Sequence, residues 1–228
     1  MPSPDLVIFD CDGVLVDSEI VAARLDAELI TAAGFPISVE EIGERYAGMT
    51  FRDILLEIEK EASIPFQASL IDDERKQLDK RLAREVKMID GAREAVARVR
   101  QPKCVCSNSS KARLEMMLGK VGILPMFGGN LFSAVDTPDV SPKPSPEIFR
   151  YAAKQMNADP AKTFVIEDSV HGVHGASAAG MRVIGFTGAS HSWPGHADRL
   201  TDAGAETVIS RLTDLQAVIE ALSEWSDS

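Results

Sequence analysis

Short apolar runs alternate with amphipathic helical patterns over most of this chain, and this alternation constrains the fold more than any other feature. Six runs rich in Val, Ile, Leu and Phe have the length of buried strands. They are Leu6–Phe9, Cys104–Cys106, Leu131–Val135, Phe164–Ile166, Val183–Phe186 and Thr207–Ile209. Helical patterns occupy Ala92–Val99, Lys111–Val121, Pro146–Gln155, Val173–Ala179 and Leu212–Leu222. Strands that alternate with helices predict an α/β fold with a parallel sheet.

One segment breaks the alternation. From Ser18 to about Lys87 the pattern is helical throughout, and Ser38 to Glu41 has the spacing of a capping box. A single crossover needs about one helix, so this length predicts an all-helical insert after the first strand. We therefore expect two domains: a core formed by residues 1–17 and 88–228, and a helical cap formed by residues 18–87.

The charge of the chain restricts its partners. The formal net charge is −11, which argues against a nucleic-acid or anionic-membrane binder, because such proteins depend on an excess of Lys and Arg. No apolar stretch is long enough to span a bilayer, and the N-terminus lacks a signal pattern. The three cysteines form no disulfide framework, so we expect a reducing cytoplasm. We also expect a monomer, with weak homodimerisation as the alternative.

Polar side chains that could take part in catalysis or binding follow the predicted strands. Open α/β sheets bind ligands outside the carboxyl ends of their strands, so these side chains should line one crevice. They are Asp10 and Asp12 after the first run, Ser107, Asn108 and Ser109 after the second, Lys143 downstream of the third, and Glu167, Asp168 and Ser169 after the fourth. Crowded carboxylates need a cation, and oxygen ligands favour Mg²⁺.

These residues suit phosphoryl transfer. Bound Mg²⁺ would keep Asp10 ionised, and an ionised aspartate is a competent nucleophile toward phosphorus. Asp12 would act as the general acid and base. Ser107, with Asn108 and neighbouring backbone amides, would hold the phosphoryl oxygens, and Lys143 would neutralise the developing charge.

Four ordered motifs carry a family resemblance. DCDGVLVDSE, SNSS, SPKPSPEIF and VIEDSVHGVHGASAAGM are similar to the signatures of the haloacid dehalogenase superfamily. They most resemble the branch that contains β-phosphoglucomutase and small phosphatases with a helical cap. The resemblance implies a Rossmann-like core, Asp10 as nucleophile, and Asp12 as acid/base with its backbone carbonyl on Mg²⁺. It also implies Asp168 as a metal ligand and Glu167 as a ligand or a group behind the ligands.

Departures from the mutases of this branch favour hydrolysis. The position that matches the mutase histidine is Ala22, and Phe51 stands in the place of the mutase arginine. A mutase must hold a second phosphate and keep water from the phosphorylated aspartate. We therefore predict an Mg²⁺-dependent phosphatase acting on a small phosphomonoester, such as a sugar phosphate or phosphorylated sugar acid. A phosphosugar mutase and a non-enzymatic binding protein on the same scaffold are the alternatives.

Several further positions are candidates for substrate contact. Residues of the insert that could face the substrate are Glu19, Gly48, Thr50 and Arg52. Lys111 is a candidate to reach the substrate phosphate, with an exposed lysine as the alternative. His191 and His196 flank Trp193; we favour surface or rim positions for them over a transition-metal site.

Overall fold

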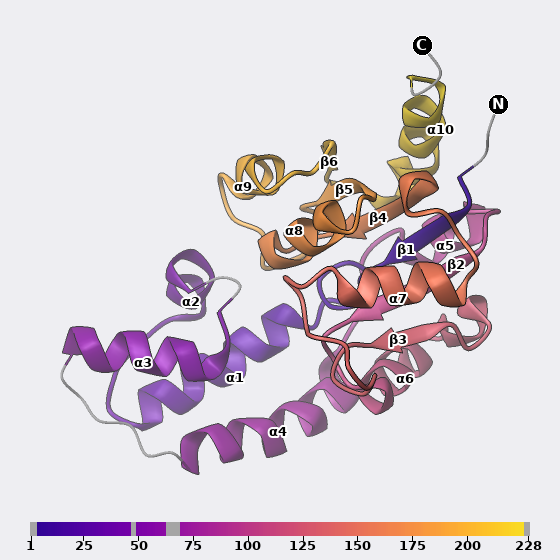
Figure 1. Cartoon of the computed structure of the whole chain (residues 1–228). Helices are drawn as coiled ribbons and strands as arrows, with labels where there is room; N and C mark the ends of the chain where they lie inside the picture. Colours follow the sequence, from indigo (N-terminus) through magenta and orange to yellow (C-terminus); the bar gives the residue numbers. More distant parts are fainter. Residues whose placement is uncertain (1–3, 47–48, 63–68, 226–228) are drawn as a thin grey trace. The chain divides into compact units, whose positions relative to one another are not determined.

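The computed structural model describes residues 4–46, 49–62 and 69–225, and its largest element is a six-stranded sheet (Figure 1). All paired strands in this sheet are parallel. The strands are β1 (Leu6–Phe9), β2 (Lys103–Ser107), β3 (Leu131–Ser133), β4 (Thr163–Glu167), β5 (Arg182–Phe186) and β6 (Thr207–Ile209). The predicted α/β class is therefore confirmed.

The order of the strands determines where a ligand can bind. They lie in the order β3-β2-β1-β4-β5-β6. The chain runs outward from β1 through β2 and β3, then returns to β4 on the other side of β1. A sheet of this kind leaves a crevice at the carboxyl ends of the two strands where the direction reverses. Here those strands are β1 and β4, in which Phe9 is paired with Ile166.

Helices cover the sheet and bury β1 along its whole length. On one face, Leu6 and Ile8 belong to an apolar core. That core also includes residues of α7 (Glu147–Gln155), α8 (Val170–Ala178) and α9 (His196–Asp202). Phe9 alternates to the other face, where its ring meets Phe127 edge-on with centroids 6.0 Å apart. The other elements of this unit are α5 (Ala92–Arg98), α6 (Lys111–Lys120), α10 (Leu215–Trp225) and the 3-10 turns η1 (Leu124–Phe127), η2 (Pro160–Lys162) and η3 (Leu212–Asp214).

Two elements differ from the sequence prediction for clear reasons. β3 ends at Ser133 instead of Val135, because the Ser133 hydroxyl accepts the Asp136 N–H (3.2 Å) and turns the chain. Val135 is 56% exposed as a result. Helix α9 was not predicted, because it is short and mostly polar, with only His196 and Leu200 buried.

Three helices begin at a residue other than the one predicted from the sequence. α8 begins at Val170 because the Ser169 hydroxyl accepts the Gly172 N–H at 2.9 Å. The helix predicted from Pro146 begins one residue later, at Glu147, with Pro146 at the N-cap position. The helix predicted over 212–222 is divided between η3 and α10.

The chain divides into two compact units, one formed by residues up to Asp17 and from Lys87 onward, the other by Ser18–Val86. Lys87, which was assigned to the insert, lies in the larger unit, where its carbonyl accepts the Asp17 N–H at 2.9 Å. The described part of the smaller unit contains helices and no strand. Its helices are α1 (Glu19–Ala32), α2 (Val39–Arg45), α3 (Phe51–Ala62) and α4 (Ser69–Glu85).

The smaller unit has an apolar core of its own. Ile30, Ile54 and Ile58 are buried in it, together with residues from α2. The predicted capping box is confirmed: the Ser38 hydroxyl accepts the Glu41 N–H, and the Glu41 carboxylate accepts the Ser38 N–H, both at 3.1 Å. That this unit acts as a cap over the substrate stays a prediction.

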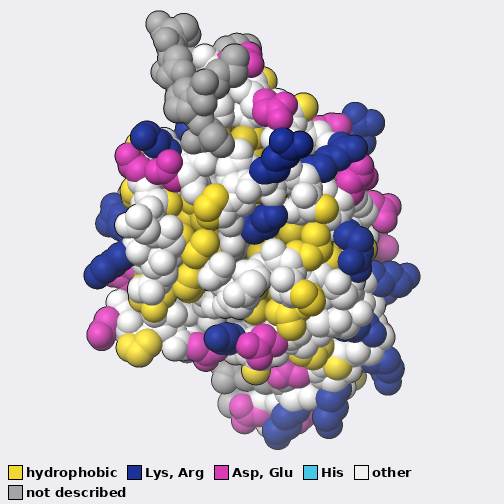
Figure 2. Space-filling view, turned by 90° about the vertical axis from the view of Figure 1, so that its right-hand side faces the viewer, with side chains coloured by type: hydrophobic (Ala, Val, Ile, Leu, Met, Phe, Trp, Pro, Cys, Tyr) yellow, Lys and Arg dark blue, Asp and Glu magenta, His cyan; other side chains and the backbone are white. Residues whose placement is uncertain are grey.

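The surface carries mixed charge. On the face drawn in Figure 2, Lys and Arg side chains are interspersed with Asp and Glu side chains and do not form one continuous basic patch. None of the described helices combines the length and the apolar character that crossing a membrane requires.

Candidate active site

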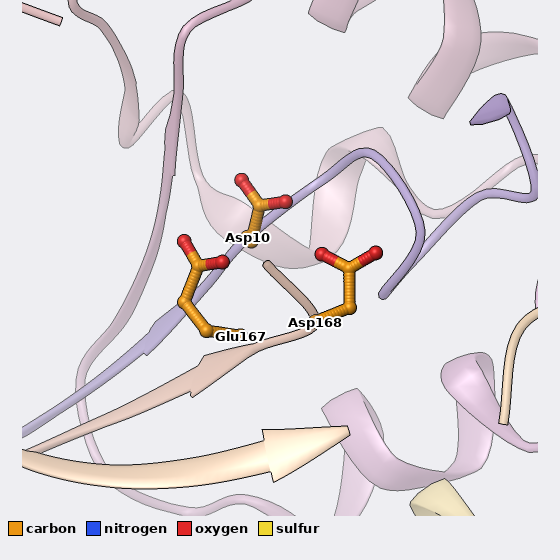
Figure 3. Close-up of side chains that lie close together, drawn as sticks. All are labelled: Asp10, Glu167 and Asp168. Atoms are coloured by element: carbon orange, nitrogen blue, oxygen red, sulfur yellow. The ribbon is translucent and has the colours of Figure 1, made fainter. Parts of the chain in front are cut away.

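Three buried carboxylates meet at the reversal point of the sheet. Asp10 follows β1, and Glu167 and Asp168 stand at the end of β4, where the Asp10 N–H donates to the Ile166 carbonyl (3.0 Å). One oxygen from each carboxylate lies within 4.8 Å of the others. Figure 3 shows the three carboxylates pointing to the same side of the strand ends. The structure thus brings together the three acids that sequence reasoning placed in one crevice.

Lys143 joins this cluster through its ammonium group. Its Nζ donates to Asp10 Oδ1 (2.6 Å), to Glu167 Oε1 (2.5 Å) and to the Cys106 carbonyl (2.8 Å). Burial disfavours the charged form of Lys143, but Asp10 and Glu167 outweigh this effect and raise its pKa above the ordinary value. Lys143 therefore remains charged between the two acids.

One lysine does not neutralise three carboxylates. Burial raises the pKa of Asp10 well above its usual value, Lys143 opposes this shift, and Glu167 and Asp168 add to it. The pKa of Glu167 is also raised, first by burial and then by Asp168, against the effect of Lys143. Such a cluster has a deficit of positive charge in a place with little water. The site therefore fits a hard divalent cation held by carboxylate oxygens.

The carboxylate oxygens differ in their availability. Both oxygens of Glu167 are occupied, because Oε1 accepts from Lys143 and Oε2 accepts from the Ser169 hydroxyl (3.1 Å). Among the described residues, no hydrogen bond reaches Asp10 Oδ2 or Asp168 Oδ1; their other oxygens accept from Lys143 and approach His191. Asp10 Oδ2 and Asp168 Oδ1 are thus the carboxylate oxygens open to a ligand, whereas Glu167 holds Lys143.

Asp12 is held by two hydroxyl groups at the end of β2. Its Oδ2 accepts from the Ser107 hydroxyl at 3.1 Å and from the Ser109 hydroxyl at 2.9 Å. The Ser109 N–H also donates to Ser107 Oγ (2.9 Å). Ser109, which the sequence places in the crevice with Ser107 and Asn108, was given no role there; the structure shows that it holds Asp12.

The Asn108 side chain forms two hydrogen bonds with the backbone of Lys143. Its Oδ1 accepts the Lys143 N–H at 2.9 Å, and its Nδ2 donates to the Lys143 carbonyl at 3.3 Å. This pair fixes the loop that carries the lysine beneath the strand ends. The predicted roles of Asn108 and Ser107 in phosphate binding stay predictions.

Two glycines leave space for the carboxylates of Asp168 and Glu167. Gly13 has a φ of +76°, and a Cβ there would stand 1.9 Å from Asp168 Oδ2. A Cβ at Gly172 would stand 2.0 Å from the Glu167 carboxylate. Cys11, between the two aspartates, is fully buried.

A loop after β5 contacts Asp168 from the side. His191 Nε2 lies 3.1 Å from Asp168 Oδ2, and His196 Nε2 lies 2.7 Å from the Asp168 carbonyl. The surface or rim position predicted for His196 is wrong, because its side chain is 2% exposed and stacks on Trp193. Burial lowers the pKa of His196. The sequence showed these residues close together but gave no sign that they lie beside β4.

The remaining candidates are one lysine of the larger unit and four residues of the predicted cap. Lys111 is exposed at the start of α6, where its N–H donates to Asp136 Oδ2 (2.6 Å). Glu19, Thr50 and Arg52 belong to the smaller unit, and Gly48 lies outside the described residues. Their predicted substrate contacts stay predictions.

Comparisons with known proteins agree with this geometry. A family model described as haloacid dehalogenase-like hydrolase matches residues 4–180. The chain is 29% identical over 191 residues to 6-phosphogluconate phosphatase from Escherichia coli (strain K12), covering 83% of this chain and 86% of that protein.

Two solved structures are similar over nearly the whole chain. A conserved haloacid dehalogenase-like protein of unknown function from Agrobacterium tumefaciens has a TM-score of 0.93 and 61% identity, covering 97% of this chain and 100% of the other. A HAD family hydrolase from Deinococcus radiodurans R1, with bound phosphate and sodium, has a TM-score of 0.83 and 29% identity, covering 98% and 97%. The chain therefore belongs to the haloacid dehalogenase-like hydrolases and is a phosphoric monoester hydrolase of that family, as its motifs predicted.

Proposed function

We propose that the protein is an Mg²⁺-dependent phosphatase that hydrolyses a small phosphomonoester through an aspartyl-phosphate intermediate. One observation carries this proposal: Lys143 occupies Oδ1 of Asp10, while Oδ2 receives no hydrogen bond from the described residues. A carboxylate held in this way has a fixed orientation and one oxygen available for attack.

Asp10 and Asp12 would have different roles in the two steps of the reaction. Asp10 Oδ2 attacks phosphorus, and the phosphorus–oxygen bond to the leaving alcohol breaks. Asp12, whose Oδ2 accepts from the two serine hydroxyls, would act as the general acid and give a proton to the departing oxygen. Asp12 then takes a proton from the water that attacks the aspartyl-phosphate, which releases phosphate and restores Asp10.

The metal would be held by Asp168, by the backbone carbonyl of Asp12 and by Asp10 through Oδ1, which keeps a lone pair beside its bond to Lys143, so that Oδ2 stays available for attack. When bound, Mg²⁺ supplies positive charge that keeps the carboxylates ionised and balances the phosphoryl oxygens. Lys143 holds Asp10 through the reaction, and Glu167 keeps Lys143 in place. Ser107 hydroxyl, once released from Asp12, would donate to a phosphoryl oxygen.

The substrate class we infer is a sugar phosphate or phosphorylated sugar acid. The similarity to 6-phosphogluconate phosphatase supports the sugar acid, and the phosphate bound in the Deinococcus structure supports a phosphate site in this family. The absence of the mutase histidine and arginine, replaced here by Ala22 and Phe51, supports water as the acceptor. Reducing cytoplasm as the compartment and a monomer as the working form stay predictions.

The test is phosphate release from p-nitrophenyl phosphate and from a panel of phosphorylated sugars and sugar acids, with and without Mg²⁺. Asp10→Asn should abolish release, and acid-quenched wild-type enzyme should carry one phosphoryl group on Asp10. Asp139→Asn is the matched control, because Asp139 is exposed and its φ of 59° suits asparagine. Normal turnover by the Asp10 variant would refute the mechanism. Exchange between phosphosugar isomers without free phosphate would identify a mutase instead.

A further inference from the structure

We propose that His191 and His196 are positioning residues that set the orientation of Asp168 from two sides. They belong to Ser190–His196, here called the histidine loop, between β5 and the start of α9. The inference rests on the proposed function, because it assigns the loop to the metal site of that reaction.

His196 holds the backbone of Asp168. Its Nε2 lies 2.7 Å from the Asp168 carbonyl oxygen, and a carbonyl oxygen only accepts, so Nε2 carries the hydrogen. The Nδ1 atom, 3.2 Å from the Ser192 hydroxyl, is then the acceptor of the neutral ring. Trp193 stacks on the imidazole, with centroids 4.1 Å apart and planes within 12°. The tautomer and the plane of the His196 ring are therefore both fixed.

His191 holds the side chain of Asp168. Its Nε2 lies 3.1 Å from Oδ2, and no hydrogen bond from the described residues reaches Oδ1. A Cβ at Gly13 would come within 2.9 Å of His191 Cε1 and 1.9 Å of Asp168 Oδ2. The absence of a side chain at residue 13 thus permits the imidazole to approach the carboxylate. His191 would keep Oδ2 occupied and turn Oδ1 toward the metal position.

The loop is also tied to the segment that carries the nucleophile. The Ser190 N–H donates to Asp17 Oδ1 (3.2 Å), and the Ser190 hydroxyl donates to Asp17 Oδ2. Asp17 stands at the end of the segment that begins with Asp10. The histidine loop therefore connects the segments that follow β1 and β4, which would supply the two carboxylate ligands. Outer partners of metal ligands usually act in this way, fixing direction without touching the metal.

The experiment measures metal binding directly. Metal-free full-length protein is titrated with Mn²⁺ by calorimetry and by the loss of the free-ion EPR signal. His191→Ala should weaken binding about 10- to 100-fold, and His191→Gln, which keeps an N–H donor, should recover part of that loss. His174→Ala is the control, because His174 is an exposed histidine on α8 and should leave binding unchanged. Melting of each metal-free variant verifies that it is folded.

Enzyme kinetics distinguish a change in the orientation of Asp168 from a general disruption of the active site. His191→Ala should raise the Mg²⁺ concentration needed for half-maximal activity and leave kcat nearly normal when Mg²⁺ is saturating. Since loss of the buried ring at residue 196 can prevent folding, Ser192→Ala, which removes only the partner of Nδ1, is the second variant. It should weaken Mn²⁺ binding by a smaller factor than His191→Ala.

The outcomes are distinct. If His191→Ala and Ser192→Ala both bind Mn²⁺ as tightly as the wild type does, the inference is overturned and the proposed function still stands. Equal loss in His191→Ala and His191→Gln, with kcat reduced at saturating Mg²⁺, also overturns it, because the N–H donor would then not matter. If the wild type binds neither Mn²⁺ nor Mg²⁺, the inference and the metal-dependent function fail together.

Discussion

The ammonium nitrogen of Lys143 donates a 2.6 Å hydrogen bond to Oδ1 of Asp10, and both side chains are almost completely buried. This contact spans 133 positions of sequence. It exists because β1 and β2 are neighbours and the loop that carries Lys143 returns beneath their carboxyl ends. The pair orients the proposed nucleophile, whose Oδ2 receives no hydrogen bond from the described residues.

Replacing Lys143 by Met should remove activity and stability together. The apolar chain fills similar space but leaves Asp10 and Glu167 without their shared cation. We expect kcat/KM to fall about 10²- to 10³-fold and the free energy of unfolding to fall by about 3 kcal/mol. Lys154→Met, at an exposed position on α7, is the control. Near-normal kcat/KM in Lys143→Met would show that the ion pair is not needed for turnover.

Replacing Gly172 by Ala should disturb Glu167. The new methyl group would stand 2.0 Å from the Glu167 carboxylate, so this side chain must leave Lys143 or α8 must shift. We expect a loss of about 1–3 kcal/mol in stability, with lower activity, measured by urea unfolding and phosphate release.

The matched control for Gly172 is Gly119→Ala on α6. The nearest atom to a Cβ there is 3.8 Å away, so this change should stabilise the protein by about 0.5–1 kcal/mol. A Gly172→Ala variant as stable as wild type would contradict the close approach of Glu167 to α8.

The burial of Asp26 in the smaller unit should make the stability of the folded protein depend on pH. It is 7% exposed on α1, and its Oδ1 has no hydrogen-bond partner among the described residues. Burial, followed by the charges of Glu74 and Glu19, raises the pKa of Asp26 to about 8. The unfolded chain has a pKa near 3.9 for such a group, so the folded state binds the proton more tightly. Its stability should therefore fall as pH rises from about 4 to about 8.

Asp26→Asn should remove this loss, because the amide never has to ionise. At pH 8 we expect the variant to be more stable than wild type by on the order of 3 kcal/mol, with little difference near pH 4. Unfolding curves across this pH range measure the effect. Asp73→Asn, exposed on α4, is the control. A variant less stable than wild type at pH 8 would mean that Asp26 is charged and paired.

Magnesium should stabilise the folded protein by mass action. An ion that binds only the folded state raises the melting temperature, and the increase grows with the logarithm of its concentration. We expect this increase in wild type, its reversal by EDTA, and its loss in Asp168→Asn. An increase of the same size in Asp168→Asn would place the ion elsewhere.

Sequence reasoning found the parts of the site that follow strands directly. Asp10 and Asp168 could be placed together because β1 and β4 are strongly apolar runs, and parallel strands bring their carboxyl ends to one edge. Lys143 could be included because its proline-flanked loop lies downstream of such a run. The family signatures gave the same residues their expected roles.

The parts that depend on tertiary contacts could not be predicted. His191 and His196 lie more than twenty residues after Asp168, in a polar loop whose path no periodicity reveals. The role of Asn108 in holding Lys143, and of Ser169 in holding Glu167, required coordinates. β3 was predicted too long because an apolar residue, Val135, follows its end and faces solvent.

The stack of Trp193 on His196 gives the protein an optical probe of its own. The chain has one other tryptophan, Trp225, so replacing it by Phe leaves a single indole, 4.1 Å from the imidazole that holds the Asp168 carbonyl. An adjacent imidazole changes indole emission as ring distance and protonation change. Intrinsic fluorescence can therefore follow the site in real time, without a label, while ions or phosphorylated ligands enter it.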